Sequence, residues 1–173
     1  ASIILLTGYS GQISLGHGAL LAIGAYTAAL TQIYLHLPVW ICFVAAVLVT
    51  SLFGALLGSA AARLSGPYLA GTTLALAVGL PSIANQFSFL GGEQGISFDA
   101  GWPPLSFGEA FTQYKWFFWI TSLAALITLW WIQNLLRSRY GRMWRAVKTN
   151  EVAAELAGIH VARSKVLAFT VSA

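Results

Sequence analysis

Residues 39–62 read VWICFVAAVLVTSLFGALLGSAAA, a run of 24 residues without a charged side chain, and the run ends at Arg63. A helix rises about 1.5 Å per residue and the hydrocarbon layer of a bilayer is about 30 Å thick, so about 20 apolar residues are needed to cross it. The run meets this requirement. It therefore predicts a helix that spans a membrane.

Three more stretches have the same character. Residues 67–89 are uncharged over 23 positions and residues 116–136 over 21, and both predict complete spans. Residues 18–34 provide 17 positions, which is near the lower limit. We expect a span there if the polar turn at residues 14–17 contributes its first residues.

Both ends of the chain are apolar as well. Residues 1–7 and 166–173 each have the composition of part of a span, and we interpret the chain as a fragment cut from a longer protein. The predicted fold is all-α: a polytopic bundle of transmembrane helices with about four complete spans and a truncated span at each end. Residues 1–173 then form a single transmembrane domain fragment.

The composition excludes a soluble enzyme. Hydrophobic residues make up 58% of the chain and charged residues 8%, whereas soluble domains are about 25% charged. A soluble globule of this size still exposes about 30% of its unfolded-chain surface, so it could not hide so much apolar area. Cys42 is the single cysteine, so no disulfide can form within the chain, and we interpret it as a packing residue.

The positive charge is concentrated in one segment. Seven of the nine basic residues fall within residues 137–165. Cytoplasmic loops of membrane proteins collect basic residues, so we expect this segment and Arg63 to lie inside and the acidic connection at residues 91–115 to lie outside. The net charge of +4 is too local for a nucleic-acid surface, and no zinc-finger, RNP or phosphate-binding glycine motif accompanies it. No nucleic-acid partner is expected.

Residues 8–18, GYSGQISLGHG, interrupt an apolar region with four glycines and several hydrogen-bonding side chains. Lipid offers no partner for free backbone amides, so such a break must be covered by protein or face water. One interpretation is a turn whose glycines permit close helix packing. The other is a broken helix that lines a solute path. Its candidate residues are Ser10, Gly11, Gln12, Ser14 and His17.

If this segment continues as a helix, Ser10, Ser14 and His17 share one face and Gln12 points elsewhere. His17 could then be a proton relay or a metal ligand. No cysteine, histidine or carboxylate stands at ligand spacing from it, which favours a hydrogen-bonded structural histidine, and no metal site is expected.

Small residues mark the second span, a proline lies in the third span, and one acidic residue lies in the turn that follows it. Gly54 and Gly58, followed at the same spacing by Ala62, form a stripe that predicts close helix packing. Pro81 predicts a kink in the third span. Glu93 lies in a glycine-rich turn at the expected outer side, where it is either a contact for a partner or a substrate amine, or simply a solvated residue.

A basic ridge follows the fourth span. Arg139, Arg142 and Arg145 are three residues apart, so in a helix they share one side, which could meet anionic lipid headgroups beneath the membrane.

Residues 150–158 carry the signals of a short helix. Asn150 is a good N-cap, Glu151 adds negative charge to the first turn, and Gly158 suits the left-handed position after the C-terminus. We predict a compact helix of about two turns. It either enters a groove of a partner protein or lies on the membrane surface.

This helix resembles a known pattern. Residues 151–154, EVAA, with Gly158 four residues later, resemble the EAA-type loop of bacterial ABC importer permeases, the coupling helix that docks on the ATPase subunit. The flanking motifs make the chain similar to branched-chain amino acid permeases of the LivM type, and the resemblance runs almost from end to end. These motifs are GYSGQISLGH (8–17), GAY (24–26), RLSGPYLA (63–70), TLA (73–75), GGEQGI (91–96) and GRMWRA (141–146).

The resemblance implies a multi-pass subunit of the bacterial cytoplasmic (inner) membrane. Its partners would be a second permease subunit, two ABC ATPase subunits and a periplasmic solute-binding protein. Residues 137–165 would form the cytoplasmic coupling loop of this permease. The ATPase-coupling residues implied by the motif are Asn150, Glu151, Ala153, Ala154 and Gly158.

The implied function is translocation of branched-chain or other small amino acids, driven by ATP and Mg bound in the ATPase partner. The chain has neither a G-x-x-x-x-G-K-[ST] loop nor a set of nucleophile, base and orienting residue, so we expect no enzyme and no bound cofactor. Related permeases carry urea or short amides, which are the alternative solutes. The alternative classes are a structural scaffold and a self-contained channel or ion-coupled carrier. A channel or carrier would place ionisable residues inside its spans, where we find none apart from His17.

Overall fold

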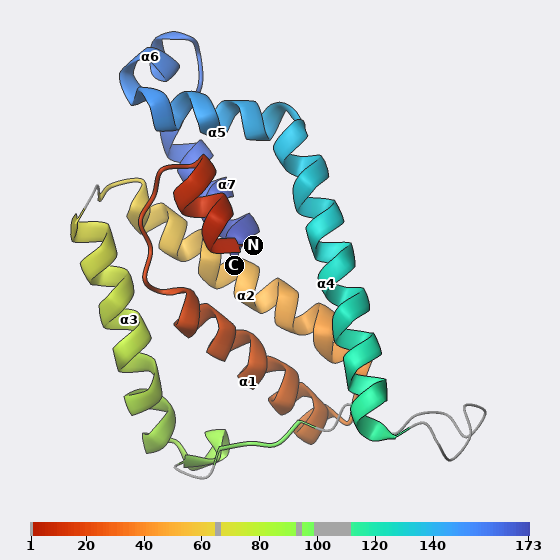
Figure 1. Ribbon diagram of the computed structural model, residues 1–173. Helices are drawn as coiled ribbons and strands as arrows, with labels where there is room; N and C mark the ends of the chain where they lie inside the picture. Colours follow the sequence, from red (N-terminus) through yellow and green to blue (C-terminus); the bar gives the residue numbers. More distant parts are fainter. Residues whose placement is uncertain (1, 65–66, 93–94, 99–111) are drawn as a thin grey trace.

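The computed structural model describes residues 2–64, 67–92, 95–98 and 112–173, and within these residues every regular element is a helix (Figure 1). This agrees with the predicted all-α bundle. The elements are η1 (Ile4–Tyr9, a π-helix), α1 (His17–Leu35), α2 (Val39–Ala61), α3 (Pro67–Gln86), η2 (Ser88–Leu90, a 3₁₀ turn), α4 (Gln113–Arg137), α5 (Arg139–Thr149), α6 (Glu151–Leu156) and α7 (Val161–Ser172).

Four helices in the described part of the chain, α1 to α4, are long and apolar enough to cross a membrane, as predicted. The boundaries of α2 agree with the sequence to one residue, and α3 ends three residues earlier than expected. One detail is wrong: residues 14–16 lie outside α1, and His17 alone of the polar turn joins it. The helix still reaches 19 residues because it continues to Leu35.

The polar connections lie at two opposite ends of the bundle (Figure 1). Helices α5 and α6 cover one end, where α2 also finishes, and the turns after α1 and α3 lie at the other end. We call the first the basic end, because it carries Arg63 and the exposed residues Arg139, Arg142 and Arg145. The alternation predicted from charge therefore agrees with the fold.

Helix α5 is amphipathic. Its basic ridge is exposed, and the opposite side buries Gly141, Trp144 and Val147. Trp144 is 1% exposed and packs in a core with residues of η1 and α7. Its indole N–H donates to the Ser164 carbonyl at 3.1 Å, so the buried ring keeps a partner for its polar atom.

Two glycines let α7 approach α2. A Cβ atom at Gly58 would lie 2.8 Å from Val166 Cα, and one at Gly54 would lie 2.9 Å from the Phe169 carbonyl oxygen. Backbone atoms cannot yield as a side chain can, so only glycine permits this separation. The predicted packing stripe is confirmed at these two positions. Its third member differs, because Ala61 is fully buried whereas Ala62 is half-buried and caps the helix.

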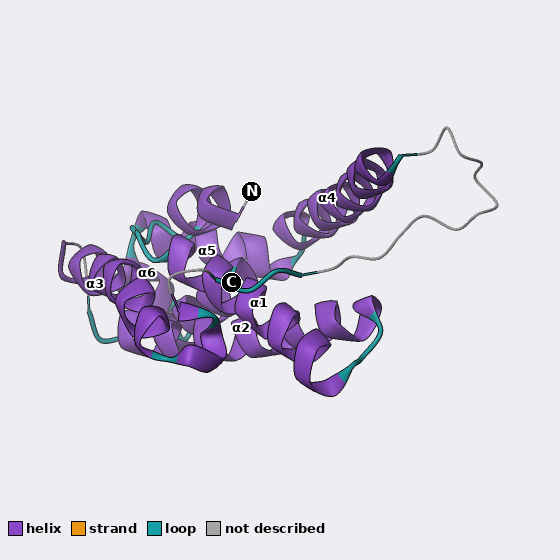
Figure 2. Ribbon diagram, turned by 90° about the horizontal axis from the view of Figure 1, so that it is seen from below, coloured by secondary structure: helices purple, strands orange, loops and turns teal. Residues whose placement is uncertain are grey.

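Helix α4 stands apart from α1, α2 and α3 in Figure 2. In the described part of the chain it buries none of its side chains, and Leu126 and Trp130 are among its exposed apolar residues. An apolar helix with this exposure needs lipid or additional protein around it.

Replacing Gly58 by alanine should destabilise the protein by about 1–3 kcal/mol, because the added methyl group meets the backbone of α7. The matched control is Gly79→Ala in α3, where a Cβ would have nothing within 4 Å. Thermal unfolding of the full-length protein in detergent gives the melting temperature of each variant. Equal melting temperatures for the two would contradict the assigned packing of α2 on α7.

Candidate functional site

Helix α6 begins at the predicted cap. The Asn150 side-chain oxygen accepts a hydrogen bond from the Ala153 N–H at 3.1 Å, and Asn150 itself is extended with φ −160°. This bond satisfies one of the N–H groups that the first turn of a helix leaves without a partner.

The C-terminus of α6 also follows the prediction. Gly158 has φ +84°, its N–H donates to the Glu155 carbonyl at 2.9 Å, and the Ile159 N–H donates to the Ala154 carbonyl at 3.0 Å. This pair of bonds is the Schellman motif, which needs a left-handed residue and so favours glycine. Capping at both ends matters because a helix of 6 residues is too short to be stable by itself.

Helix α6 is short, and most of its side chains are exposed. Ala154 is 4% exposed and attaches the helix to the bundle, whereas Val152 and Leu156 are 67% and 86% exposed. Ala153 is exposed as well. The helix thus presents apolar side chains outward from the basic end.

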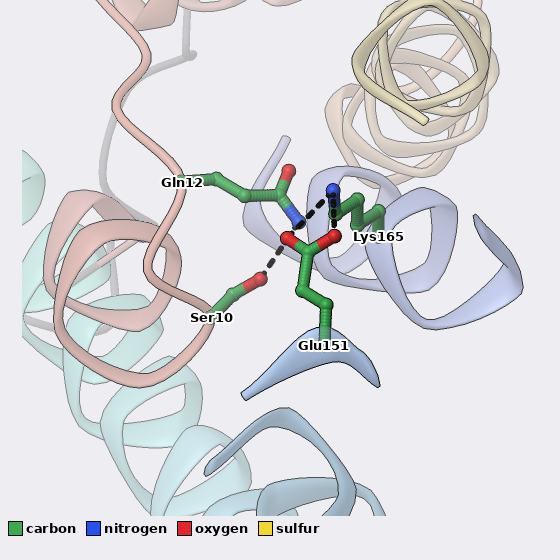
Figure 3. Close-up of polar contacts among 4 residues, drawn as sticks. All are labelled: Ser10, Gln12, Glu151 and Lys165. Atoms are coloured by element: carbon green, nitrogen blue, oxygen red, sulfur yellow. Dashed lines mark hydrogen bonds and ion pairs between the residues drawn. The ribbon is translucent and has the colours of Figure 1, made fainter. Parts of the chain in front are cut away.

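The side chain of Glu151 turns back toward its own chain. Its two carboxylate oxygens lie 2.8 and 3.0 Å from the Lys165 ammonium nitrogen on α7 (Figure 3). The Lys165 side chain is 8% exposed and that of Glu151 is 54% exposed. Sequence reasoning counted Lys165 only as one of the basic residues. The position of Lys165 directly before the apolar run 166–173 could have indicated this ion pair, because a lysine that is buried requires an acidic partner.

The polar break is not helical. Residues 11–16 join η1 to α1 as irregular backbone, so Ser10, Ser14 and His17 do not share one helix face. The arrangement that a continuous helix would give, with Gln12 pointing elsewhere, therefore does not apply, and the Gln12 side-chain amide donates to Ser10 Oγ at 2.9 Å (Figure 3). Gly11 has φ +72°, a conformation that glycine adopts readily and that permits irregular backbone here.

Protein groups bond part of the backbone of this break. The Gln12 N–H donates to the Leu6 carbonyl at 3.1 Å, and the Leu15 N–H donates to Thr73 Oγ1 of α3 at 3.0 Å. Thr73 is 1% exposed, and a Cβ at Gly16 would lie 3.1 Å from its Cβ and carbonyl oxygen. One side of the break is thus buried against protein, whereas Gly11, Ile13 and Leu15 are exposed, and in a membrane that side requires water or further protein.

His17 begins α1 and contacts the end of α7. One of its ring nitrogens, Nε2, lies 2.8 Å from Ser172 Oγ. This contact supports the interpretation of a hydrogen-bonded structural histidine. Among the described residues, no group of three or more histidine, cysteine or acidic side chains is placed to hold a metal ion.

Two of the sites predicted from separate parts of the sequence meet at the basic end. The Lys148 ammonium group donates to the Gly8 carbonyl at 2.6 Å, and a Cβ at Gly11 would lie 2.9 Å from Lys148 Cγ. The pairs Ser10–Gln12 and Glu151–Lys165 point toward one another in Figure 3. The polar break and the predicted coupling loop are therefore neighbours. The predicted outer contact, Glu93, lies outside the described residues.

A cavity of about 960 Å³ opens between α1, α2, α4 and the end of α7. Its lining is mostly apolar, includes Phe43 and Trp131, and contains no charged residue. None of the predicted path residues, Ser10 to His17, lines it. Among the described residues, the lining offers a charged solute no counter-ion, and the cavity does not coincide with the predicted path.

Thr73→Val should destabilise the protein by about 1 kcal/mol, because it removes the hydroxyl that accepts the part-buried Leu15 N–H. Thr72→Val is the matched control, since the Thr72 hydroxyl is exposed and bonds only carbonyls of its own helix. We expect its effect to stay within about 0.5 kcal/mol. Thermal unfolding in detergent measures the stability of both variants. If Thr73→Val costs as little stability as Thr72→Val, the Thr73 hydroxyl does not hold the break.

Comparison with known proteins identifies the family. The model for "Branched-chain amino acid transport system / permease component" matches residues 1–173. The chain is 34% identical to the high-affinity branched-chain amino acid transport system permease protein LivM of Salmonella typhimurium and 33% identical to that of Escherichia coli. Each match covers 98% of this chain and 45% of the relative, so the chain spans less than half of their length. No solved structure matches. A match over all 173 residues, together with four apolar helices and the capped α6, places the chain in the family of permease components of branched-chain amino acid transport systems.

Proposed function

We propose that this chain is part of the membrane-spanning permease subunit of an ABC importer, which carries branched-chain or other small amino acids across the bacterial inner membrane. The family supports this proposal, and so do the two relatives, each named as a permease protein of a branched-chain amino acid transport system. In this assignment the basic end faces the cytoplasm, in keeping with the rule that cytoplasmic loops carry the basic residues.

The observation that carries the proposal is the geometry of α6. It is a capped helix of 6 residues that projects from the basic end, with Val152 and Leu156 exposed. Exposed apolar side chains on a short rigid helix suit insertion into a groove of a partner protein. The partner proposed for this helix is the ABC ATPase, which binds ATP and Mg and performs the hydrolysis.

Transport requires that the ATPase act differently on two states of the permease, because a ligand shifts an equilibrium only through its differential affinity. We propose that the ATP-bound and free ATPases hold α6 in two positions. Through α5 and α7, movement of α6 would reach the break, because its Gly11 lies against Lys148 of α5 and His17 at its end contacts Ser172 of α7. The break would then open and close a path for the solute.

The remaining partners follow from the same assignment. A second permease subunit and a periplasmic solute-binding protein would complete the importer, and the exposed ridge of Arg139, Arg142 and Arg145 would lie at the anionic lipid headgroups. Urea and short amides are the alternative solutes. Competition of uptake among leucine, isoleucine, valine, other amino acids and urea in proteoliposomes identifies the cargo.

Leu156→Asn should reduce the amount of ATPase that co-purifies with the full-length protein in mild detergent. The residue is 86% exposed, so the substitution removes an apolar contact for the partner without disturbing the fold. The second permease serves as the internal control and should be retained, because the substitution changes only α6. If no ATPase co-purifies with the wild-type protein, the proposed importer is wrong and the protein is a channel, a carrier or a scaffold.

Gly158→Val should uncouple transport, lowering both uptake and substrate-stimulated ATP hydrolysis while leaving membrane insertion intact. A Cβ at Gly158 meets nothing within 4 Å, so the cost comes from the left-handed backbone and is about 1–2 kcal/mol. Gly158→Asn is the matched control, because asparagine tolerates this conformation better. Full activity of the valine variant would argue against α6 as the coupling element.

A further inference from the structure

We propose that Glu151 acts in coupling through Lys165 of its own chain, and that this ion pair is the link by which movement of α6 reaches α7. The inference rests on the proposed function, since it concerns the residue through which the docked helix transmits force. It makes Lys165 a positioning residue that the EAA-type motif does not contain.

The geometry places the pair between two helices that otherwise touch little. Helix α6 attaches to the bundle through Ala154, the one side chain it buries. The Lys165 ammonium nitrogen lies 2.8 and 3.0 Å from the two carboxylate oxygens of Glu151, so both oxygens are engaged. Charge-assisted bonds of this length are about twice as strong as neutral ones.

The two partners differ in their exposure to water. Lys165 is 8% exposed and flanked on its helix by Ser164 and Ala168, which are both buried, whereas Glu151 is 54% exposed. Without its partner Glu151 regains water, but Lys165 cannot do so unless α7 moves. A displacement of Glu151 therefore acts on α7.

Helix α7 is well placed to pass this movement on. It packs against α2 through Gly54 and Gly58, and its Ser172 hydroxyl contacts His17 at the end of the polar break. Before the break, Leu5 and Leu6 of η1 pack in one core with Ala168 and Phe169 of α7. The helix that carries Lys165 therefore contacts the chain on both sides of the break.

The competing explanation is that Glu151 contacts the ATPase directly. The two explanations differ at Lys165, which is too buried to touch a partner docked on α6. A purely structural role for the pair predicts a change in stability without a change in coupling. Lys165→Met removes the buried charge, and the Glu151 carboxylate that loses its partner is 54% exposed and keeps its contact with water. Lys165→Met is therefore expected to fold, and its effect on coupling decides the question.

The experiment uses the full-length permease reconstituted with its second permease, ATPase and binding protein. It measures uptake per ATP hydrolysed in Glu151→Gln, Lys165→Met and the double variant. We expect each single variant to lower this ratio by roughly tenfold, within the range of typical coupling free energies. The double variant should be no worse than the more severe single one, because both remove the same link.

Three controls accompany the variants. Lys165→Arg keeps the charge and should keep most of the coupling. Glu155→Gln removes an exposed carboxylate from the same helix and should match the wild type. The reversed pair, Glu151→Lys with Lys165→Glu, should recover uptake relative to Glu151→Lys alone.

Two results would overturn the inference: wild-type coupling in Lys165→Met, or multiplicative losses in the double variant. The amount of co-purified ATPase separates this failure from that of the proposed function. If the ATPase binds every variant equally and Lys165→Met remains coupled, Glu151 acts on the ATPase and the link is wrong. If the wild type binds no ATPase at all, the importer assignment itself is wrong.

Discussion

Backbone N–H and C=O groups at membrane depth have no water to bond, and this constraint governs the whole structure. Four helices satisfy it internally. Residues 11–16 do not, and Leu6 and Thr73 supply acceptors for two of their N–H groups, those of Gln12 and Leu15. The packing of α3 and η1 around this segment is the physical condition for having a polar break here.

The same break connects the two parts of the candidate site. Because its backbone runs from the basic end toward the start of α1, it lies against Lys148 of α5 at Gly11, and His17 at its end contacts α7. A rigid helix in its place could not follow such a path. The proposed coupling therefore depends on an irregular segment held by helices on several sides, and movement of any of these helices alters the hydrogen bonds around it.

Local features were predictable and distant pairings were not. Asn150 and Gly158 were identified because caps depend on residues within one turn. The ridge of Arg139, Arg142 and Arg145 followed from helical spacing alone. The shared face of Ser10, Ser14 and His17 depended on a continuous helix, which the irregular backbone of residues 11–16 does not provide. Thr73 and Lys165 were missed because their partners lie 58 and 14 positions away, across different helices.

By itself, the sequence determined that the chain is an all-α membrane protein, where its spans lie, which loops share a side and where the short helix begins and ends. These depend on apolar length, charge and capping, which act over a few residues. Only the tertiary structure decided that the break is irregular, that α7 lies against the glycines of α2, and that Glu151 pairs with Lys165. Such contacts join residues far apart in the chain, and helix packing selects them rather than local preference.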